Sequence, residues 1–243
     1  MSRYSRLLLV IMVAIVSGRV MAQEITPTPD PCPTPQISNA AASYYIGLGN
    51  ALFSRGDFSG AVVAYTCAIE QQPDYAPTYV SRGYAQASLQ DNEQAMADYN
   101  RAIELDELLT SAYNNRGTLY TRLGNFGLAI NDFTLVISLS PEDVTAYHNR
   151  AVVHAAEGNY ELAIADLEQA LAIDADFAPS YAALGAVYSA IAAQQYQQFV
   201  ELRGDNALLP AGTPIEVLQA VDEGMRTGDY SVWVALQTAA GAE

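Results

Sequence analysis

The chain has 243 residues, with 27 acidic residues, 11 arginines and no lysine, and its net charge at neutral pH is −16. A negative field of this strength repels phosphate groups, so the composition argues against nucleic acids and anionic lipid surfaces as partners. The acidity favours solubility and can steer a basic partner, but it specifies neither a fold nor a function.

Residues 1–22 have the layout of a secretory signal peptide. Arg3 and Arg6 precede an apolar run over residues 7–16, and small residues favour cleavage after Ala22. The apolar run is shorter than the roughly 20 residues that span a membrane. We therefore expect an exported protein, either secreted or in the cell envelope or periplasm, with an uncleaved N-terminal membrane anchor as the alternative. After cleavage, eight arginines face 27 acidic residues, for a net charge of −19.

Residues 23–41 are interpreted as a proline-rich linker. Prolines alternate with other residues at positions 27, 29, 31, 33 and 35, a pattern that favours a stiff polyproline II spacer. The linker contains Cys32, and the only other cysteine of the chain is Cys67. In an exported protein these two cysteines can form a disulfide that ties the linker to the region that follows. The alternative is two independent thiols, with Cys67 as a small packing residue.

A period of 34 residues organises residues 42–177 and continues beyond them. Each period has a tyrosine, then a small residue one helical turn later, then an alanine and a large side chain in a second predicted helix. The members are Tyr45, Tyr79, Tyr113, Tyr147 and Tyr181; Gly49, Gly83, Gly117, Ala151 and Gly185; Ala61, Ala95, Ala129 and Ala163; and Tyr65, Tyr99, Phe133 and Leu167. Small residues let two helices approach closely, and the large side chains fill the space between them. The pattern predicts four helical hairpins, at residues 42–75, 76–109, 110–143 and 144–177.

This pattern resembles the tetratricopeptide repeat (TPR), a helical hairpin of 34 residues. The family's Leu-Gly pair is present at Leu48–Gly49 and Leu184–Gly185, and its closing proline is Pro73 and Pro141, replaced elsewhere by Glu107 and Ala175. The resemblance implies an all-α fold, an α-solenoid in which the hairpins stack as a right-handed superhelix. It also implies that the first helices line a concave groove that receives a protein or peptide.

Three repeats share a charged pair that the first repeat lacks. An arginine replaces the leucine of Leu48, and an acidic residue stands where the first repeat has Ala64. Because charge and countercharge occur together within a repeat, we predict an ion pair inside each hairpin. The predicted pairs are Arg82–Asp98, Arg116–Asp132 and Arg150–Asp166. The alternative is a row of arginines that binds an anionic ligand.

Residues 178–203 contain no turn signal and keep apolar residues at three- and four-residue spacing. This predicts one long helix that caps the last repeat. Residues 204–243 are expected to form a degenerate helical hairpin. Thr213 and Pro214 start its first helix, and Gly228 and Asp229 form the turn before a second helix that carries Trp233. A strand over residues 230–236 is the alternative for that last element.

The resemblance places residues next to the tyrosine and small-residue positions on the wall of the groove. Asparagine and hydroxyl side chains can hydrogen-bond a peptide backbone, and aromatic side chains supply apolar anchors. The candidates are Asn50, Phe53, Tyr84, Asn114, Asn115, Thr118, Arg122, His148 and Asn149. In the third repeat, Asn114, Asn115, Thr118 and Arg122 are expected to remain free for a partner. An ordinary solvated helix face is the alternative.

The sequence offers no recognisable catalytic, cofactor or metal site. His148 and His154 are the only histidines, and neither has a partner that suggests a metal site; no glycine-rich phosphate loop or nucleophile motif is present. We therefore expect a non-enzymatic interaction scaffold without cofactors. The alternative is a self-associating structural module, with the long helix and the region of Trp233 as the interface between copies.

Overall fold

The computed structural model describes residues 15–16, 19–20, 32 and 41–203. Most of the expected signal peptide (1–22) and linker (23–41), and all of the expected C-terminal hairpin (204–243), therefore lie outside the described residues. Near the N-terminus, β1 (Ile15–Val16) and β2 (Arg19–Val20) form a short antiparallel pair with Ile15 opposite Val20. The remainder of the described chain is helical, apart from Cys32 and the short connections between helices.

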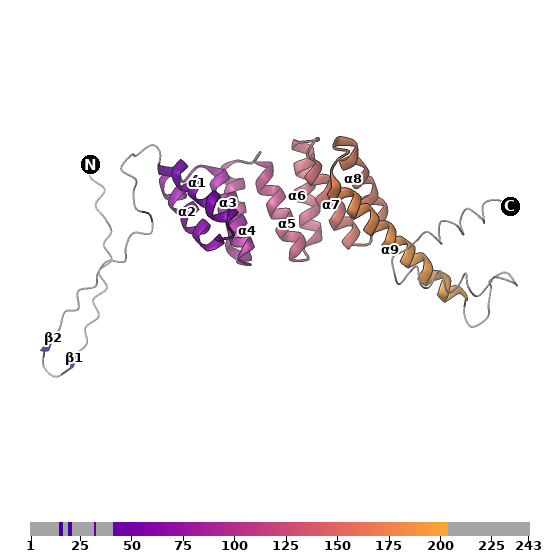
Figure 1. Ribbon diagram of the computed structural model, residues 1–243, viewed down its shortest axis with the longest axis horizontal. Helices are drawn as coiled ribbons and strands as arrows, with labels where there is room; N and C mark the ends of the chain where they lie inside the picture. The colour runs from indigo at the N-terminus through magenta and orange to yellow at the C-terminus, as the bar shows by residue number, and fades with distance from the viewer. Residues whose placement is uncertain (1–14, 17–18, 21–31, 33–40, 204–243) are drawn as a thin grey trace.

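Each predicted repeat contains two helices of 13 or 14 residues (Figure 1). Three residues connect the two helices of a hairpin, and four residues connect one hairpin to the next. The helices are α1 (Ala41–Ser54), α2 (Phe58–Gln71), α3 (Ala76–Ser88), α4 (Asn92–Leu105), α5 (Thr110–Arg122), α6 (Phe126–Leu139), α7 (Val144–Ala156) and α8 (Tyr160–Ile173). The 34-residue period therefore places the helices correctly.

The turn inside each hairpin needs one residue in the left-handed backbone region. Gly56, Gly124 and Gly158 supply it, with φ between 76° and 80°. Glycine adopts this conformation without steric cost because it has no Cβ. In the second hairpin, Gln90 takes the same position with φ at 66°, at a cost of roughly 1–2 kcal/mol. The turn thus forms in all four hairpins, although only three have the glycine.

Within a hairpin, the small residue of the first helix lies against the large side chain of the second. A Cβ atom added to Gly49, Gly83 or Gly117 would come within 2.5–2.8 Å of the ring of Tyr65, Tyr99 or Phe133, respectively. Tyr65, Tyr99 and Phe133 are 1–3% exposed, and Leu167 is fully buried at the same position of the fourth hairpin. The close approach that the periodic glycines imply is therefore present in the core of the fold.

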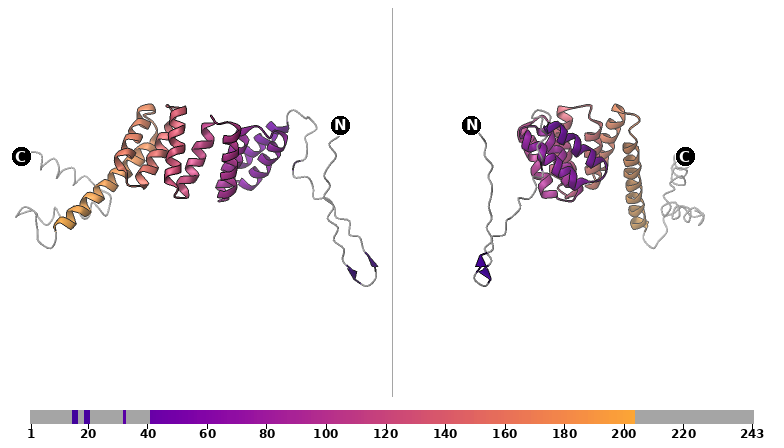
Figure 2. Two further views of the ribbon diagram at one scale, coloured as in Figure 1. Left: turned by 180° about the vertical axis from the view of Figure 1, so that it is seen from behind. Right: turned by 60° about the vertical axis from the view of Figure 1, so that its left-hand side comes forward.

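The hairpins stack side by side in one row from α1 to α9 (Figure 2). Apart from contacts between consecutive helices, α3 contacts α5, α5 contacts α7, and α7 contacts α9. Within the described residues, no two second helices contact each other to a comparable extent. The first helices therefore lie on the inner side of the curved stack. The exposed faces of α1, α3, α5, α7 and the first half of α9 are called the inner wall below.

The helix α9 (Ala178–Arg203) follows the fourth hairpin and packs on α7 and α8. Its residues Ala183, Leu184, Val187 and Ile191 join the cluster that contains Ala151, Ala163 and Leu167. The helix is 26 residues long, and its second half extends beyond the stack (Figure 1). Neither α9 nor any other helix of the described residues has the length and apolar character needed to cross a membrane.

Candidate functional site

One exposed residue per first helix forms a column along the inner wall. Each follows the small residue of its helix by one position, so the 34-residue period aligns them. The wall column consists of Asn50, Tyr84, Thr118, Val152 and Ala186, all exposed. The groove residues predicted from the sequence include the first three and omit Val152 and Ala186, although their spacing from Thr118 is sufficient to find them. The column changes from polar and aromatic in the first three repeats to aliphatic at α7 and α9.

An aromatic cluster lies at the N-terminal end of the inner wall. Phe53 of α1 stacks on Tyr84 of α3, with ring centroids 5.0 Å apart and planes at 28°. Phe58, the first residue of α2, supports Phe53 from the other side, again at 5.0 Å. Tyr84 is 52% exposed, so one aromatic side chain is held in place and still open to solvent. The sequence pattern indicates Phe53 and Tyr84 separately and does not predict their contact across two repeats.

Asn50 is anchored by one of its two polar groups. Its Oδ1 accepts a hydrogen bond from the hydroxyl of Tyr65, at 2.7 Å, while the side chain stays on the exposed face of α1. Among the described residues, the Asn50 amide nitrogen has no partner. A fixed, open N–H donor of this kind can bind a carbonyl group of an extended chain.

The polar residues of α5 are less available than expected from the sequence. Asn114 donates from Nδ2 to Asp143 at 3.2 Å, and so links α5 to the start of α7, while its Oδ1 is buried without a partner. Asn115 and Thr118 donate to backbone carbonyls of their own helix, at 2.8 and 2.9 Å. The expectation that these three side chains remain free is therefore wrong. Their hydrogen-bonding groups stabilise the stack first.

Arg122 and His148 also contact neighbouring repeats. Arg122 donates to Asn92 of α4 at 2.8 Å, so the expectation that it is free is wrong as well. The His148 Nδ1 lies 3.2 Å from the hydroxyl of Ser180, and its ring meets Phe177 edge-on at 5.5 Å. Burial lowers the pKa of His148 below its ordinary value. Asn149, the last groove candidate, is half-buried on α7.

The three arginines of α3, α5 and α7 lie in the positions that the repeat comparison predicts. Each guanidinium donates from Nε and Nη2 to both oxygens of one carboxylate in its own hairpin, at 2.7–2.9 Å. The pairs are Arg82–Asp98, Arg116–Asp132 and Arg150–Asp166, with arginine side chains 19% exposed and aspartates at most 11%. The hydrogen bonds to the aspartates raise the pKa of each arginine.

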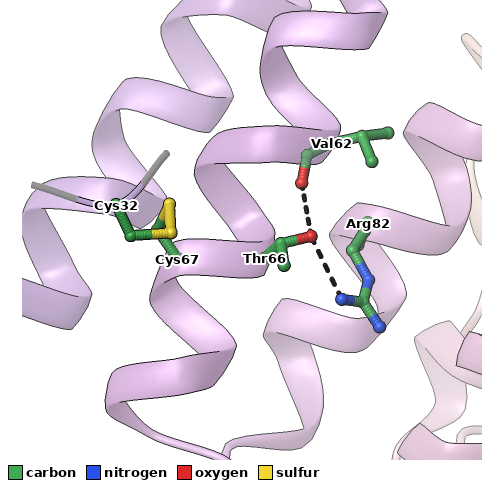
Figure 3. Close-up of a disulfide and its surroundings, with 5 residues drawn as sticks. All are labelled: Cys32, Val62, Thr66, Cys67 and Arg82. Carbon is green, nitrogen blue, oxygen red and sulfur yellow. Dashed lines mark hydrogen bonds between the residues drawn. A yellow bond between two sulfur atoms is a disulfide. The ribbon is translucent and has the colours of Figure 1, made fainter. Parts of the chain in front are cut away.

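The same arginines make a third contact that the repeat comparison does not predict. The remaining nitrogen, Nη1, reaches the preceding hairpin, where it donates to Thr66 at 3.2 Å, Asn100 at 2.7 Å or Thr134 at 3.1 Å (Figure 3 shows the first). Each guanidinium thus joins the two helices of its hairpin and also ties that hairpin to the one before. With all of these partners filled, the row of arginines is not an open site for an anionic ligand.

The charges of the repeat region are segregated. The helices α1, α3, α5 and α7 contain no aspartate or glutamate. The acidic residues of the four hairpins lie on the second helices and in the connections. The inner wall is therefore close to neutral in a strongly acidic protein. Arg122 and the three paired arginines are the only arginines on those four helices.

The N-terminal end of the stack is closed by a disulfide. Cys32 is bonded to Cys67 of α2, one helical position before Ala68 (Figure 3). Cys32, Cys67 and Ala68 pack with Tyr45, and all four residues are at most 4% exposed. Tyr45 begins the first repeat and has no earlier hairpin to cover it. The cysteine from the linker helps to fill that place.

A small apolar cavity lies at the other end of the stack. It has a volume of about 270 Å³ and lies between α7, α8 and α9, lined by Ala151, Val152, Ala155, Tyr160, Leu167, Ala183, Ala186, Val187 and Ala190. No polar group capable of acid–base chemistry is among its lining residues. Within the described part of the chain, no cluster of histidine, cysteine, aspartate and glutamate has the composition of a metal site.

Family comparisons agree with the repeat structure. Models of the TPR repeat match residues 49–90 and 83–124, and tetratricopeptide repeat models match residues 110–143 and 144–177. Comparison with curated protein sequences gives no match.

Solved structures with the same fold include MamA, at 23% identity and a TM-score of 0.53 over 60% of this chain and 85% of that one. A fragment of MamA from Desulfovibrio magneticus RS-1 has 18% identity and a TM-score of 0.55, over 68% and 96% of the chains. YrrB, described as a TPR protein with an unusual peptide-binding site, has 25% identity and a TM-score of 0.52, over 59% and 74%. Repeat period, helix packing and family models agree, and the chain belongs to the tetratricopeptide repeat family.

Proposed function

We propose that this protein is a non-catalytic scaffold that acts outside the cytoplasm and binds a protein or peptide on its inner wall. Membership of the TPR family supports an interaction role, and the peptide-binding site of the similar protein YrrB is consistent with it. The surface is made of helix faces with side chains suited to hydrogen bonding and apolar contact. Its exposed residues offer no nucleophile with an adjacent base, so their chemistry favours binding over catalysis.

The observation that carries this proposal is the stacked pair Phe53–Tyr84 on a wall without acidic side chains. An aromatic side chain that is fixed by packing and half exposed provides contact area at little cost in conformational entropy, which is typical of binding anchors. The open amide of Asn50 lies on the same face of α1 and supplies a donor for a peptide carbonyl. Asn114, Asn115, Arg122 and His148 are better explained as residues that hold the wall in shape.

The neutral wall also indicates the chemistry of the partner. A basic peptide would find its countercharges on the second helices rather than beside the aromatic pair. An acidic peptide would be repelled by the net charge of the chain and would find Arg82, Arg116 and Arg150 already paired. The favoured ligand is therefore an uncharged segment with an apolar or aromatic side chain that packs on Tyr84.

Export is supported by two independent features. Residues 1–22 have the composition of a signal peptide, and Cys32 is joined to Cys67. Disulfides persist in oxidising compartments and are rare in reducing ones. Fractionation of the native cells, with detection of the mature N-terminus by mass spectrometry, tests this part of the proposal. Retention of the intact protein in the cytoplasm with free thiols contradicts it.

Binding is tested by selecting ligands from a random peptide library on the purified exported chain. The proposal expects uncharged peptides with aromatic or large aliphatic side chains, and a loss of affinity of at least about tenfold in Tyr84→Ala, or about 1.4 kcal/mol. Tyr75→Ala is the matched control, because Tyr75 is 42% exposed and lies in the connection before α3. Selected peptides that bind both variants equally, or that are mainly charged, refute the assignment of the site.

Self-association is a second candidate function, favoured by the exposure of α9. Tyr181 and Tyr188 are 57% and 52% exposed on that helix, which is unusual for tyrosines at their positions of the repeat. Light scattering over a wide range of protein concentration distinguishes the two functions. A monomer at all concentrations removes the second candidate and leaves the peptide-binding proposal untouched.

A further inference from the structure

The helix α9 has the sequence of a first helix, but the second helix that such a helix packs against is missing from the described residues. In the first three hairpins, a Cβ on the periodic glycine would lie within 2.8 Å of a ring of the second helix. Gly185 occupies that position in α9, and no atom lies within 4 Å of the corresponding Cβ. The space that Tyr65, Tyr99 and Phe133 fill elsewhere is open beside α9.

The tyrosines of α9 lead to the same conclusion. At the first position of the period, Tyr45, Tyr79 and Tyr113 are 3–8% exposed. Tyr45 packs with Ala68 and Tyr113 with Val136, both from the second helix of their own hairpin. Tyr181 holds the same position in α9 and is 57% exposed, and Tyr188, one turn after Gly185, is 52% exposed. We define Tyr181, Gly185 and Tyr188 as the open face of α9. They project from one side of the helix, because their spacings are four and three residues.

We propose that residues 213–227 of this chain cover the open face of α9 as its second helix. Forty residues follow Arg203, and the sequence predicts a helix start at Thr213–Pro214 and a turn at Gly228–Asp229. The length of that segment matches the second helices of the four hairpins, which all have 14 residues. Its apolar residues Val217, Leu218, Val221 and Met225 recur at helical spacing.

The geometry of the connection permits this contact. Gly185 lies 18 residues before Arg203, which is about 27 Å along a helix. A helix over residues 213–227 runs back along α9 for about 22 Å, which brings its end close to the level of Tyr188. The intervening residues 204–212 contain glycine, asparagine and proline, which suit a reversal of the chain. The fifth hairpin is then completed with a longer connection than the others. This contact lies on a different side chain set from the aromatic pair of the inner wall, so it stands or falls independently of peptide binding.

The first test uses the sign of glycine-to-alanine substitutions in the full chain. In an exposed helix position, alanine stabilises because it restricts the unfolded chain and favours the helix. At a position pressed against a neighbouring helix, the added Cβ destabilises instead. Gly47 on α1 is the control for an open position, and Gly117, against Phe133, is the control for a covered one. The proposal expects Gly185→Ala to lower the melting temperature, as Gly117→Ala does. A rise like that of Gly47→Ala overturns it.

The second test uses Trp233, the only tryptophan of the chain, as a reporter of docking. With residues 213–227 held on α9, we expect Trp233 to be partly protected from acrylamide quenching. Tyr188→Asp should increase the quenching, because it places a charge on the open face, and Tyr75→Asp is the control that adds the same charge elsewhere. Both tyrosines are exposed among the described residues, so neither change disturbs the described core.

The concentration dependence of the reporter identifies the source of the covering helix. Docking within one chain predicts the same quenching over two orders of magnitude of protein concentration. Quenching that rises on dilution shows that a second copy supplies the helix, which overturns the proposal in favour of self-association. Equal quenching of Tyr188→Asp, Tyr75→Asp and the unchanged protein also overturns it, because the open face is then not involved.

Discussion

Arg116 and Asp132 face each other across the third hairpin, with Nε donating to one carboxylate oxygen at 2.9 Å and Nη2 to the other at 2.8 Å. The third nitrogen of the guanidinium donates to Asn100 in the preceding hairpin. The carboxylate accepts a planar, two-pronged donor, which is the strongest arrangement available to this pair of side chains. A residue that would pass for a ligand-binding charge in fact connects two hairpins.

The first prediction concerns the energy of this pair. Asp132→Ala should lower the free energy of unfolding by about 3–5 kcal/mol, because it leaves a mostly buried guanidinium without its countercharge. Adding Arg116→Leu recreates the Leu48–Ala64 combination of the first hairpin, so the double variant should regain much of the loss. Urea unfolding followed by circular dichroism measures both effects. A double variant no more stable than the worse single variant contradicts a coupled pair.

The pairing of arginine with aspartate can be predicted from the sequence, whereas the third contact of each arginine cannot. Aspartate appears wherever arginine replaces the leucine of Leu48, so the partners can be matched without coordinates. Thr66, Asn100 and Thr134 also recur at 34 residues, yet they vary in type and follow a more prominent large side chain. Their role depends on how far one hairpin is rotated and shifted against the next. The period determines which residues are equivalent, and it does not determine that rotation.

The same limit explains the outcome for the inner wall. The period correctly locates the first helices, and it places Asn50, Tyr84 and Thr118 in one column. It cannot show that Asn114 reaches Asp143 or that Arg122 reaches Asn92, because both contacts connect different repeats through positions without a repeated pattern. A polar side chain on an exposed helix face thus carries little information on its own about ligand binding. The stacked pair Phe53–Tyr84 is more informative because it remains exposed after its internal contacts are made.

The second prediction concerns the disulfide between Cys32 and Cys67. Replacing Cys32 by serine and Cys67 by alanine should destabilise the first hairpin, by up to about 4 kcal/mol for a loop with a sequence separation of 35. The loss combines chain entropy with the uncovering of Tyr45. Thermal unfolding with and without a reducing agent provides the measurement. Reductant should destabilise the unchanged protein and have no effect on the double variant; equal melting temperatures throughout show that the bridge does not stabilise the fold.

The third prediction concerns the close approach of helices within a hairpin. Gly117→Ala should destabilise by about 1–3 kcal/mol, because the new Cβ would lie 2.8 Å from the Phe133 ring, which is fully buried and cannot move aside. Gly47→Ala, at an open position of α1, should instead stabilise by roughly 1 kcal/mol. Chemical denaturation of the two variants under identical conditions measures the difference. The same sign for both changes is incompatible with the packing described for Gly117.

The fourth prediction concerns the pH dependence of stability near neutrality. Burial lowers the pKa of His148 from its ordinary value of 6.5, so the unfolded chain takes up a proton at higher pH than the folded chain does. Between that value and the lower pKa of the folded state, the unfolded chain binds more protons. The free energy of unfolding should therefore be highest above about pH 6.5, fall as the pH drops through this window, and level off once both states are protonated.

His148→Gln tests this assignment, because glutamine can still bond the hydroxyl of Ser180 and does not titrate. The variant should lose most of the slope between about pH 7.5 and the onset of carboxylate protonation, which begins near about pH 5. His154→Gln changes the other histidine of the chain and is the matched control. The measurement is urea unfolding at a series of pH values. A slope that survives in His148→Gln and disappears in His154→Gln places the titrating group in the last turn of α7 instead, and shows that the buried ring against Phe177 is not the source of the acid sensitivity.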